Sequence, residues 1–279
     1  RDLQKDFEDI FNDPLSFNNL KLAMISSNGD AEDKYNIIMF FIANKRNYKA
    51  MEEYSQWRLI GSTHKEMTEE YTIDIKNENQ RVSNEQRRND RARTLLEKFS
   101  KAHVYNEIDS EAYKQLLRLN VIEYNRLNDN KGVKFDFSIW DNKSLEHIYP
   151  KSMFFHTVVN EETQEIRYVR GDGADISFDK TKDLRNSDTE FSNSSRYSEH
   201  CIGNLVLLYG KNNSEFSNLP FEDKKFKFFH NERKFESRNL LHTISSFASS
   251  KWDIKEIESS ADSFIERFKK DYNIQENNE

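Results

Sequence analysis

Two short apolar runs with polar residues at one end constrain this chain more than any other feature. The first is Ser144-Leu-Glu-His-Ile-Tyr-Pro150, and the second opens at Asn204 and continues as Leu205-Val-Leu-Leu-Tyr209. Their length and composition predict two buried strands. Polar side chains held on rigid strands suggest a site, so Glu146, His147 and Asn204 are the first candidates for functional residues.

Apolar spacing predicts helices on both sides of these runs. Helical periodicity covers residues 1 to about 60, the stripe Ala92–Phe99, the stripe Tyr113–Tyr124 and the stripe Ile254–Phe268. Residues 68–86 are polar and acidic and predict an exposed helix or loop. The overall pattern therefore predicts a mainly helical α+β protein.

A change of pattern near residue 130 predicts a domain boundary. The turn residues 128–132 end a helix, and Val133–Trp140 then alternates with period two, which predicts a strand. We expect a helical linker or scaffold region over residues 1–130 and a second domain over residues 131–279. Residues 152–199 form an apparent insertion between the two apolar runs, with a β-hairpin predicted over 165–178 and a polar loop over 186–198.

Composition limits the classes of protein and of metal site. The chain has 35% apolar residues and 21 phenylalanines, enough for a real core, and no run approaches the roughly 18 apolar residues of a membrane span. Cys201 is the only cysteine, which excludes an internal disulfide and a multi-cysteine zinc site. Any metal must bind oxygen and imidazole groups, which favours Mg²⁺ or Mn²⁺. We expect a cytoplasmic protein with no membrane partner.

The polar ends of the two runs match the pattern of the HNH, or His-Me finger, nucleases. In that pattern one strand ends in an acidic residue and histidine, a second opens with asparagine, and a polar ligand follows nine residues later; here these are Glu146-His147, Asn204 and Asn213. Phosphodiester cleavage needs an activated water and neutralised charge on the phosphate and the leaving oxygen. A neutral imidazole can supply the first and one divalent ion the second.

Further motifs narrow this resemblance. They are Phe135-Asp-Phe137, Glu146-His-Ile148 with Pro150, Gly203-Asn-Leu205, Asn213, Asn218 with Pro220-Phe221, Lys224, Trp252 and Ile257. Together they resemble the C-terminal nuclease domain of GmrSD-like type IV restriction and anti-phage proteins, over about residues 131–272. The preceding helices are similar to that family's linker region. The resemblance implies a ββα-metal core surrounded by helices, and two departures from it, Lys151 and the insertion of about 48 residues, bear on substrate geometry.

The resemblance also implies roles for individual residues. His147 would be the general base, Glu146 and Asn213 the ligands of a single Mg²⁺ or Mn²⁺, and Asn204 a brace for the loop that carries His147. The nine-residue spacing favours Asn213 over its neighbour Asn212 as the ligand. Cationic groups for the phosphate would come from Lys224, Lys225 or Arg233.

Several residues have two interpretations. His200 either contacts substrate or metal or is a surface or packing residue, and His156, His230 and His242 are expected on the surface. The basic and aromatic segment 221–238 fits a phosphate-tracking face or an ordinary amphipathic helix. The net charge of −7 restricts nucleic-acid contact to a local basic surface.

The resemblance implies a metal-dependent endonuclease or nickase that acts on phage or modified DNA. An N-terminal sensor domain, similar to ParB/sulfiredoxin-type NTPases, would control it; Arg1 in place of a starting Met is consistent with a piece of such a longer chain. Double-strand cleavage would need two successive nicks or a homodimer. The alternatives are a catalytically inactive HNH-like module that binds nucleic acid or protein, and a nuclease directed at RNA.

Overall fold

The computed structural model describes residues 2–27, 29–74, 77–171, 173–184, 189–191, 195–230 and 235–275. Over these residues the chain is a mainly helical α+β protein, with twelve α-helices and three small β-sheets. This confirms the predicted fold class at that level. Packing divides the chain into two units: Arg1–Leu95 with Lys114–Ser138, and Leu96–Tyr113 with Ile139–Glu279. The assignment of 1–130 as a scaffold region and 131–279 as a nuclease domain stays a prediction.

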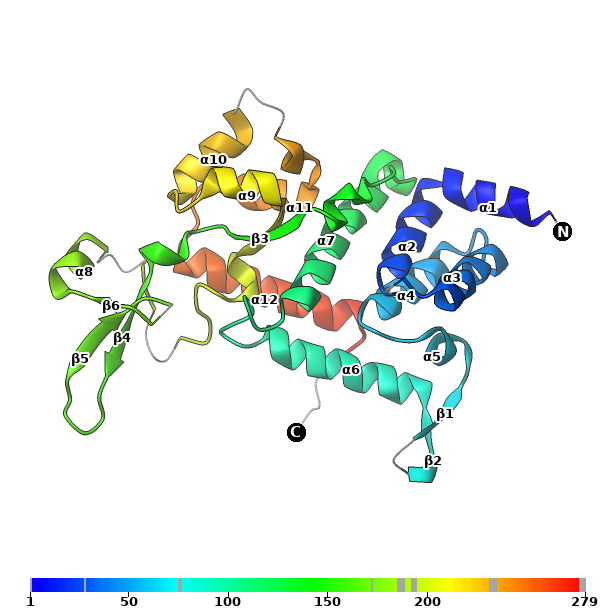
Figure 1. Cartoon of the computed structure of the whole chain (residues 1–279), viewed down its shortest axis with the longest axis horizontal. Helices are drawn as coiled ribbons and strands as arrows, with labels where there is room; N and C mark the ends of the chain where they lie inside the picture. The colour runs from blue at the N-terminus through cyan, green and yellow to red at the C-terminus, as the bar shows by residue number, and fades with distance from the viewer. Residues whose placement is uncertain are drawn as a thin grey trace. The chain divides into compact units, whose positions relative to one another are not determined.

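The first unit is built on helices that begin at polar capping residues. Their bounds are α1 Leu3–Asn12, α2 Pro14–Ile25, α3 Ala31–Ala43, α4 Tyr48–Leu59 and α5 His64–Thr68, as predicted for residues 1 to about 60 (Figure 1). The side chains of Asp2, Asp13, Asp30, Asn47 and Thr63 accept hydrogen bonds from backbone N–H groups of the first turns. Such caps satisfy donors that have no partner within the helix.

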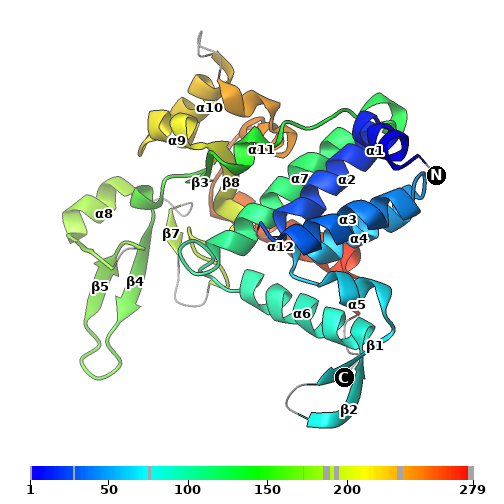
Figure 2. The same cartoon turned by 45° about the vertical axis from the view of Figure 1, so that its right-hand side comes forward.

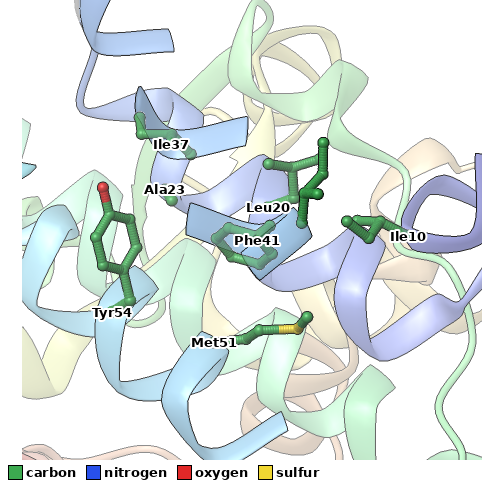
Figure 3. Close-up of a cluster of buried hydrophobic side chains, with 8 residues drawn as sticks. Ile10, Leu20, Ala23, Ile37, Phe41, Met51 and Tyr54 are labelled. Carbon is green, nitrogen blue, oxygen red and sulfur yellow. The ribbon is translucent and has the colours of Figure 1, made fainter. Parts of the chain in front are cut away.

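The core of this unit lies between α1, α2, α3 and α4. Apolar residues three or four apart along each helix face one another and are almost fully buried. Figure 3 shows them gathered around Phe41: Ile10, Leu20, Ala23, Ile37, Met51 and Tyr54. The phenol of Tyr54 stacks on Phe40 with ring centroids 3.9 Å apart and bonds to Nδ1 of His64 at 2.9 Å.

Two predictions for the segments around these helices are wrong. The polar stretch 68–86 contains an antiparallel hairpin, β1 Tyr71–Asp74 with β2 Asn77–Ser83, before α6 Asn84–Phe99. Cross-strand backbone pairing therefore organises a segment whose sequence is largely polar. Val133–Trp140 is not a strand; it is irregular and ends in the short 3-10 helix η1 Phe137–Trp140.

The alternation in that second segment has another physical origin. Phe135 and Ile139 are buried, but the backbone bonds to a side chain instead of a strand. The amide of Asn18 donates to the carbonyl of Val133 at 2.9 Å and accepts from the N–H of Phe135 at 2.8 Å. One buried asparagine thus satisfies the extended backbone, just after α7 Asp109–Asn130 ends at residues with positive φ.

The second unit contains the two predicted strands. The strands β3 Lys143–His147 and β8 Leu205–Tyr209 pair antiparallel, and all five residues of β8 are buried. The helix α9 Gly210–Phe216 follows β8 directly. Around them lie η2 Lys151–Met153, η3 Ile202–Asn204, α10 Phe221–His230, η4 Glu236–Asn239, α11 Leu241–Phe247 and α12 Ile254–Asp271. The stripe predicted for the last helix is confirmed, since Ile257, Ala261 and Ile265 are buried.

The insertion forms a sheet of its own. Its strands are β4 Phe155–Val159, β5 Ile166–Val169, β6 Asp175–Ile176 and β7 Glu190–Phe191, in the order β6-β5-β4-β7, with α8 Phe178–Leu184 between β6 and β7. Figures 1 and 2 both show β4, β5 and α8 side by side. The predicted hairpin is confirmed as β5 with β6. Of the predicted loop 186–198, residues 186–188 and 192–194 lie outside the described residues, and Glu190–Phe191 form β7 instead of loop.

Candidate active site

The pairing of β3 with β8 brings the first three candidates together. Glu146 lies opposite Val206 and His147 opposite Leu205, so Asn204 sits just beyond the last pair. The N–H of Ile148 donates to the carbonyl of Asn204 at 2.8 Å, which continues the ladder by one bond. Alternate residues of a strand face opposite sides, but β3 ends at His147 and both Glu146 and His147 line one cavity.

Asn204 holds the segment that follows His147. Its side chain is fully buried, and its Oδ1 accepts from the N–H of Tyr149 at 2.9 Å. Its Nδ2 donates to the carbonyls of Tyr149 and Glu199, both at 2.9 Å. A buried amide with three satisfied bonds is rigid. These contacts support the bracing role that was expected for Asn204.

Glu146 and Lys224 form a buried ion pair. The Nζ of Lys224 lies 2.5 Å from Oε1 of Glu146 and donates to the carbonyl of His147 at 2.7 Å. The Lys224 side chain is 1% exposed. Burial raises the pKa of Glu146 and lowers the pKa of Lys224, in each case against the attraction of the other charge. Glu146, the predicted metal ligand, and Lys224, a predicted phosphate-binding residue, therefore form an ion pair with each other.

His147 is a buried imidazole in contact with a second histidine. Its Nε2 lies 3.1 Å from Nδ1 of His200, and the ring of Tyr105 meets it edge-on at 4.5 Å. Burial lowers the pKa of His147 well below 6.5, and the charges of His200, Lys224 and Lys151 act in the same direction. The imidazole is therefore neutral at neutral pH. His200 is also buried and does not line the cavity, so it lies next to His147 away from the surface.

Asn213, and not Asn212, reaches the cavity. The Nδ2 of Asn213 donates to Oγ of Ser144 at 2.5 Å and to the carbonyl of Leu145 at 3.1 Å. Asn212 is buried, and its Oδ1 accepts from the N–H and the hydroxyl of Ser237 at 2.9 and 2.7 Å. Because Nδ2 of Asn213 is hydrogen-bonded to β3, its Oδ1 is the atom that can bind a cation.

These side chains surround one cavity of about 450 Å³. Its lining consists of Tyr105, Ser144, Leu145, Glu146, His147, Pro150, Lys151, Gly210, Asn213, Ser214, Ser217, Asn218 and Lys224. All of them belong to the second unit. The sequence did not single out Tyr105, because it lies in a loop before α7 with no motif around it. Glu199 was also missed, although Glu199-His200 repeats the acid-histidine pair Glu146-His147 and could have been noticed.

Other predicted residues do not reach the cavity. Lys225 donates to the carbonyl of Ser249 at 2.6 Å, and Lys227 donates to that of Glu215 at 3.0 Å. Two lysines of α10 thus bind backbone carbonyls of other segments. Phe226, on the same helix, is exposed. Arg233 lies outside the described residues. His156 is half-buried, and its Nε2 bonds to Oε2 of Glu199 at 2.7 Å. His230 is exposed, as expected, and His242 is half-buried.

The cavity can be compared with what a divalent metal needs. No group of three or more His, Cys, Asp or Glu side chains suited to a metal occurs among the described residues. Glu146 and Asn213 nevertheless place a carboxylate and an amide oxygen on the same polar cavity. Mg²⁺ binds few protein oxygens and keeps several waters, so this donor set fits it.

Within the described part of the chain, no helix is both long and apolar enough to span a membrane.

Comparison with known families identifies the chain. Residues 70–267 match the family described as GmrSD restriction endonucleases, C-terminal domain. The chain belongs to this family. The match begins before residue 131, where the motifs of the GmrSD C-terminal domain begin, and it includes every residue that lines the cavity. Comparisons with curated proteins and with solved structures gave no significant match. Membership in the GmrSD family implies a nuclease of restriction systems, with DNA as its substrate.

Proposed function

We propose that the chain is an endonuclease or nickase that hydrolyses DNA phosphodiesters with one divalent ion, Mg²⁺ or Mn²⁺. One observation carries this proposal: His147, Glu146, Asn213 and Lys224 line a single polar cavity. In the proposal, β3, β8 and α9 form the ββα-metal core of a His-Me finger nuclease. The family membership supports a nuclease, and the cavity supports these residues as its active site.

In this mechanism His147 is the general base. Its lowered pKa keeps the imidazole neutral, so a ring nitrogen can accept a proton from the attacking water. Asn204 fixes the loop after His147 through Tyr149, which holds the imidazole at the edge of the cavity. Lys224 lines the same cavity, so its ammonium would balance negative charge on a phosphate bound there.

Glu146 and Asn213 are the residues that would hold the metal. When bound there, Mg²⁺ or Mn²⁺ would neutralise charge on the phosphate and on the leaving oxygen. Glu146 would then be shared between the ion and Lys224. The distance of 2.5 Å between Lys224 Nζ and Glu146 Oε1 keeps that carboxylate oriented before any ion arrives.

In the proposed biological role the enzyme restricts phage or otherwise modified DNA. An N-terminal NTPase or sensor domain of a longer chain would license cutting, as the resemblance to GmrSD-like proteins implies. A single site cuts one strand, so a double-strand break would require two nicks or two copies of the chain. These points concern control and outcome, and they do not alter the chemistry at His147.

Nicking of supercoiled plasmid tests the proposal. We expect the wild type to convert plasmid to the nicked or linear form with Mg²⁺ or Mn²⁺, and His147→Ala to cut about 10²- to 10⁴-fold more slowly. His230→Ala is a matched control, because His230 is exposed and does not line the cavity. A folded His147→Ala protein that cuts at the wild-type rate would disprove the role of His147. Cleavage of RNA by the same protein, with the same metal ions, shows whether DNA or RNA is the preferred substrate.

The second candidate function is an inactive module that binds nucleic acid or protein. The buried pairing of Glu146 with Lys224 favours it, since that pairing engages the carboxylate expected to bind metal. Binding of labelled DNA without nicking, under every metal tested, would support this candidate. Nicking that disappears in His147→Ala would exclude it.

A further inference from the structure

We propose that Glu199 and His200 are positioning residues that set the tautomer of His147, and that the sheet of the insertion, a segment whose last residue is Glu199, encloses them. The inference rests on the proposed function of His147 as a base. Glu199 and His200 do not line the cavity proposed to hold the metal, so they are a separate group of residues.

A continuous line of contacts leads away from His147. Nε2 of His147 lies 3.1 Å from Nδ1 of His200. Nε2 of His200 in turn lies 3.9 Å from Oε1 of Glu199, too far for a hydrogen bond but close enough for a strong electrostatic effect in a buried place. The other oxygen of Glu199, Oε2, bonds to Nε2 of His156 at 2.7 Å. Two imidazoles thus lie between the cavity and a carboxylate.

The contacts of His147 decide which of its nitrogens can act. Its Nε2 is occupied by His200, so only Nδ1 is left to accept a proton from water. A neutral imidazole has one N–H and one lone pair. For Nδ1 to carry the lone pair, the proton of His147 must be on Nε2 and be donated to Nδ1 of His200.

The carboxylate selects this arrangement. If His200 accepts at Nδ1, its own proton is on Nε2, where it faces Oε1 of Glu199. The opposite arrangement would turn a lone pair toward the negative charge and place a proton on Nδ1 of His147, which blocks the base. A carboxylate that fixes the tautomer of a catalytic imidazole performs the same task in serine proteases.

The state of Glu199 supports this reading. The residue is fully buried, and its Oε1 has no hydrogen-bond partner among the described residues. Burial would raise its pKa, but the hydrogen bond from His156 and the nearby charges of His156 and His200 outweigh burial and lower the pKa. Glu199 is therefore ionised at neutral pH, and an ionised group with one unpaired buried oxygen orients any proton nearby. His103 and Tyr105 stack on His200 and hold its ring in place.

The insertion supplies the enclosure. His156 comes from β4, and Gly171 comes from the turn between β5 and β6. A Cβ atom at Gly171 would lie 1.8 Å from Oε1 of Glu199 and 2.7 Å from Nε2 of His200. Only glycine lets the insertion backbone approach this closely. The segment between the two core strands thus covers the carboxylate and excludes water from it.

The test separates positioning from simple stability. Glu199→Gln keeps the shape of the side chain and removes its charge. We expect kcat for plasmid nicking to fall about 10²-fold or more, by analogy with amide substitution in the serine protease triad, with KM unchanged. Glu199→Asp retains the charge and should recover part of the loss. Glu190→Gln, on β7 of the insertion's sheet, is the matched control and should leave kcat unchanged, because Glu190 is exposed and its carboxylate accepts a hydrogen bond from the hydroxyl of Thr157.

Nitrogen-15 NMR of the histidine rings gives a readout independent of cleavage. At a pH where the imidazoles are neutral, the wild type should show His147 as the Nε2–H tautomer, assigned by comparison with His147→Gln. In Glu199→Gln the signal should move toward the Nδ1–H tautomer. His200→Gln interrupts the same line of contacts and serves as the second variant if Glu199→Gln does not fold.

The outcomes distinguish two failures. If the wild type does not nick DNA, the proposed function fails while the tautomer measurement still stands. If His147 has the Nδ1–H tautomer in the wild type, or keeps one tautomer in the wild type and in both folded variants, the positioning role of Glu199 and His200 is wrong. Equal losses of kcat in Glu199→Gln and Glu199→Asp, with the His147 tautomer unaltered, would also overturn it.

Discussion

At the scale of single residues, burial sets the direction of the pKa shift at four ionisable groups in and beside the cavity. It raises the pKa of Glu146 and lowers the pKa of His147, of His200 and of Lys224. In each case burial favours the neutral form. The charges of Glu146 and Lys224 are kept because each has the other beside it.

His242, which does not line the cavity, allows the effect of burial on a pKa to be measured as a change in stability. Burial first, and the charge of Arg267 second, lower its pKa from 6.5 to about 4. Between these values the unfolded chain binds a proton that the folded protein does not. The contribution of His242 to the free energy of unfolding is therefore largest above pH 6.5 and falls as the pH drops toward 4.

We predict that His242→Gln makes this pH dependence shallower. Urea unfolding of the wild type and the variant, at several pH values between 4 and 6.5, measures it. His230→Gln is the control, because His230 is exposed. Equal slopes for the wild type and His242→Gln would show that His242 does not resist protonation in the folded protein.

At the scale of elements, a close approach between η3 and α12 fixes the residue that braces the site. Gly203 lies next to Asn204, and a Cβ atom there would be 2.1 Å from the carbonyl oxygen of Ile257 and 2.6 Å from the N–H nitrogen of Ala261. Both are backbone atoms of a long helix and cannot rotate aside. The position of Asn204 thus depends on a helix some fifty residues later in the chain.

We predict that Gly203→Ala is destabilising by about 3 kcal/mol or more, because a methyl group has no space against helix backbone. Thermal unfolding measures the change. Gly210→Ala is the matched control, since a Cβ atom there would meet only the carbonyl oxygen of Asn142 at 3.6 Å, an ordinary contact. A Gly203→Ala protein as stable as Gly210→Ala would mean that η3 can move away from α12.

At the scale of the whole molecule, each of the two units has apolar packing of its own. The first unit has an apolar core around Phe41, and the second is held by the buried strand β8 and the apolar stripe of α12. The residues proposed to hold the ion already have protein partners: Glu146 binds Lys224, and Asn213 binds Ser144 and Leu145. This differs from small zinc domains, in which metal binding supplies the folding energy.

We therefore predict that EDTA abolishes nicking without unfolding the protein. Circular dichroism should show the same helix content and a cooperative transition with and without the chelator. Added Mg²⁺ should restore nicking and raise Tm only by the amount that ligand binding to the folded state supplies. Loss of helix content in EDTA would show that the metal is structural.

Local patterns were sufficient for the parts of the fold whose chemistry is local. The helices of residues 1 to about 60, the stripe of α12 and the pairing of β5 with β6 follow from apolar periodicity and turn residues. The strand predicted over Val133–Trp140 failed because alternation reports burial of side chains, whereas a strand also needs a backbone partner. Asn18, more than one hundred residues earlier, supplies that partner here.

The same division holds for the candidate site. Sequence alone determined Glu146, His147, Asn204 and Asn213 as candidates, because their spacing at the ends of two short apolar runs is a property of the chain. Only the tertiary structure decided that Lys224 pairs with Glu146 and that Glu199 lies behind His200. These contacts join segments far apart in sequence, and buried charges acquire partners only when packing excludes water around them.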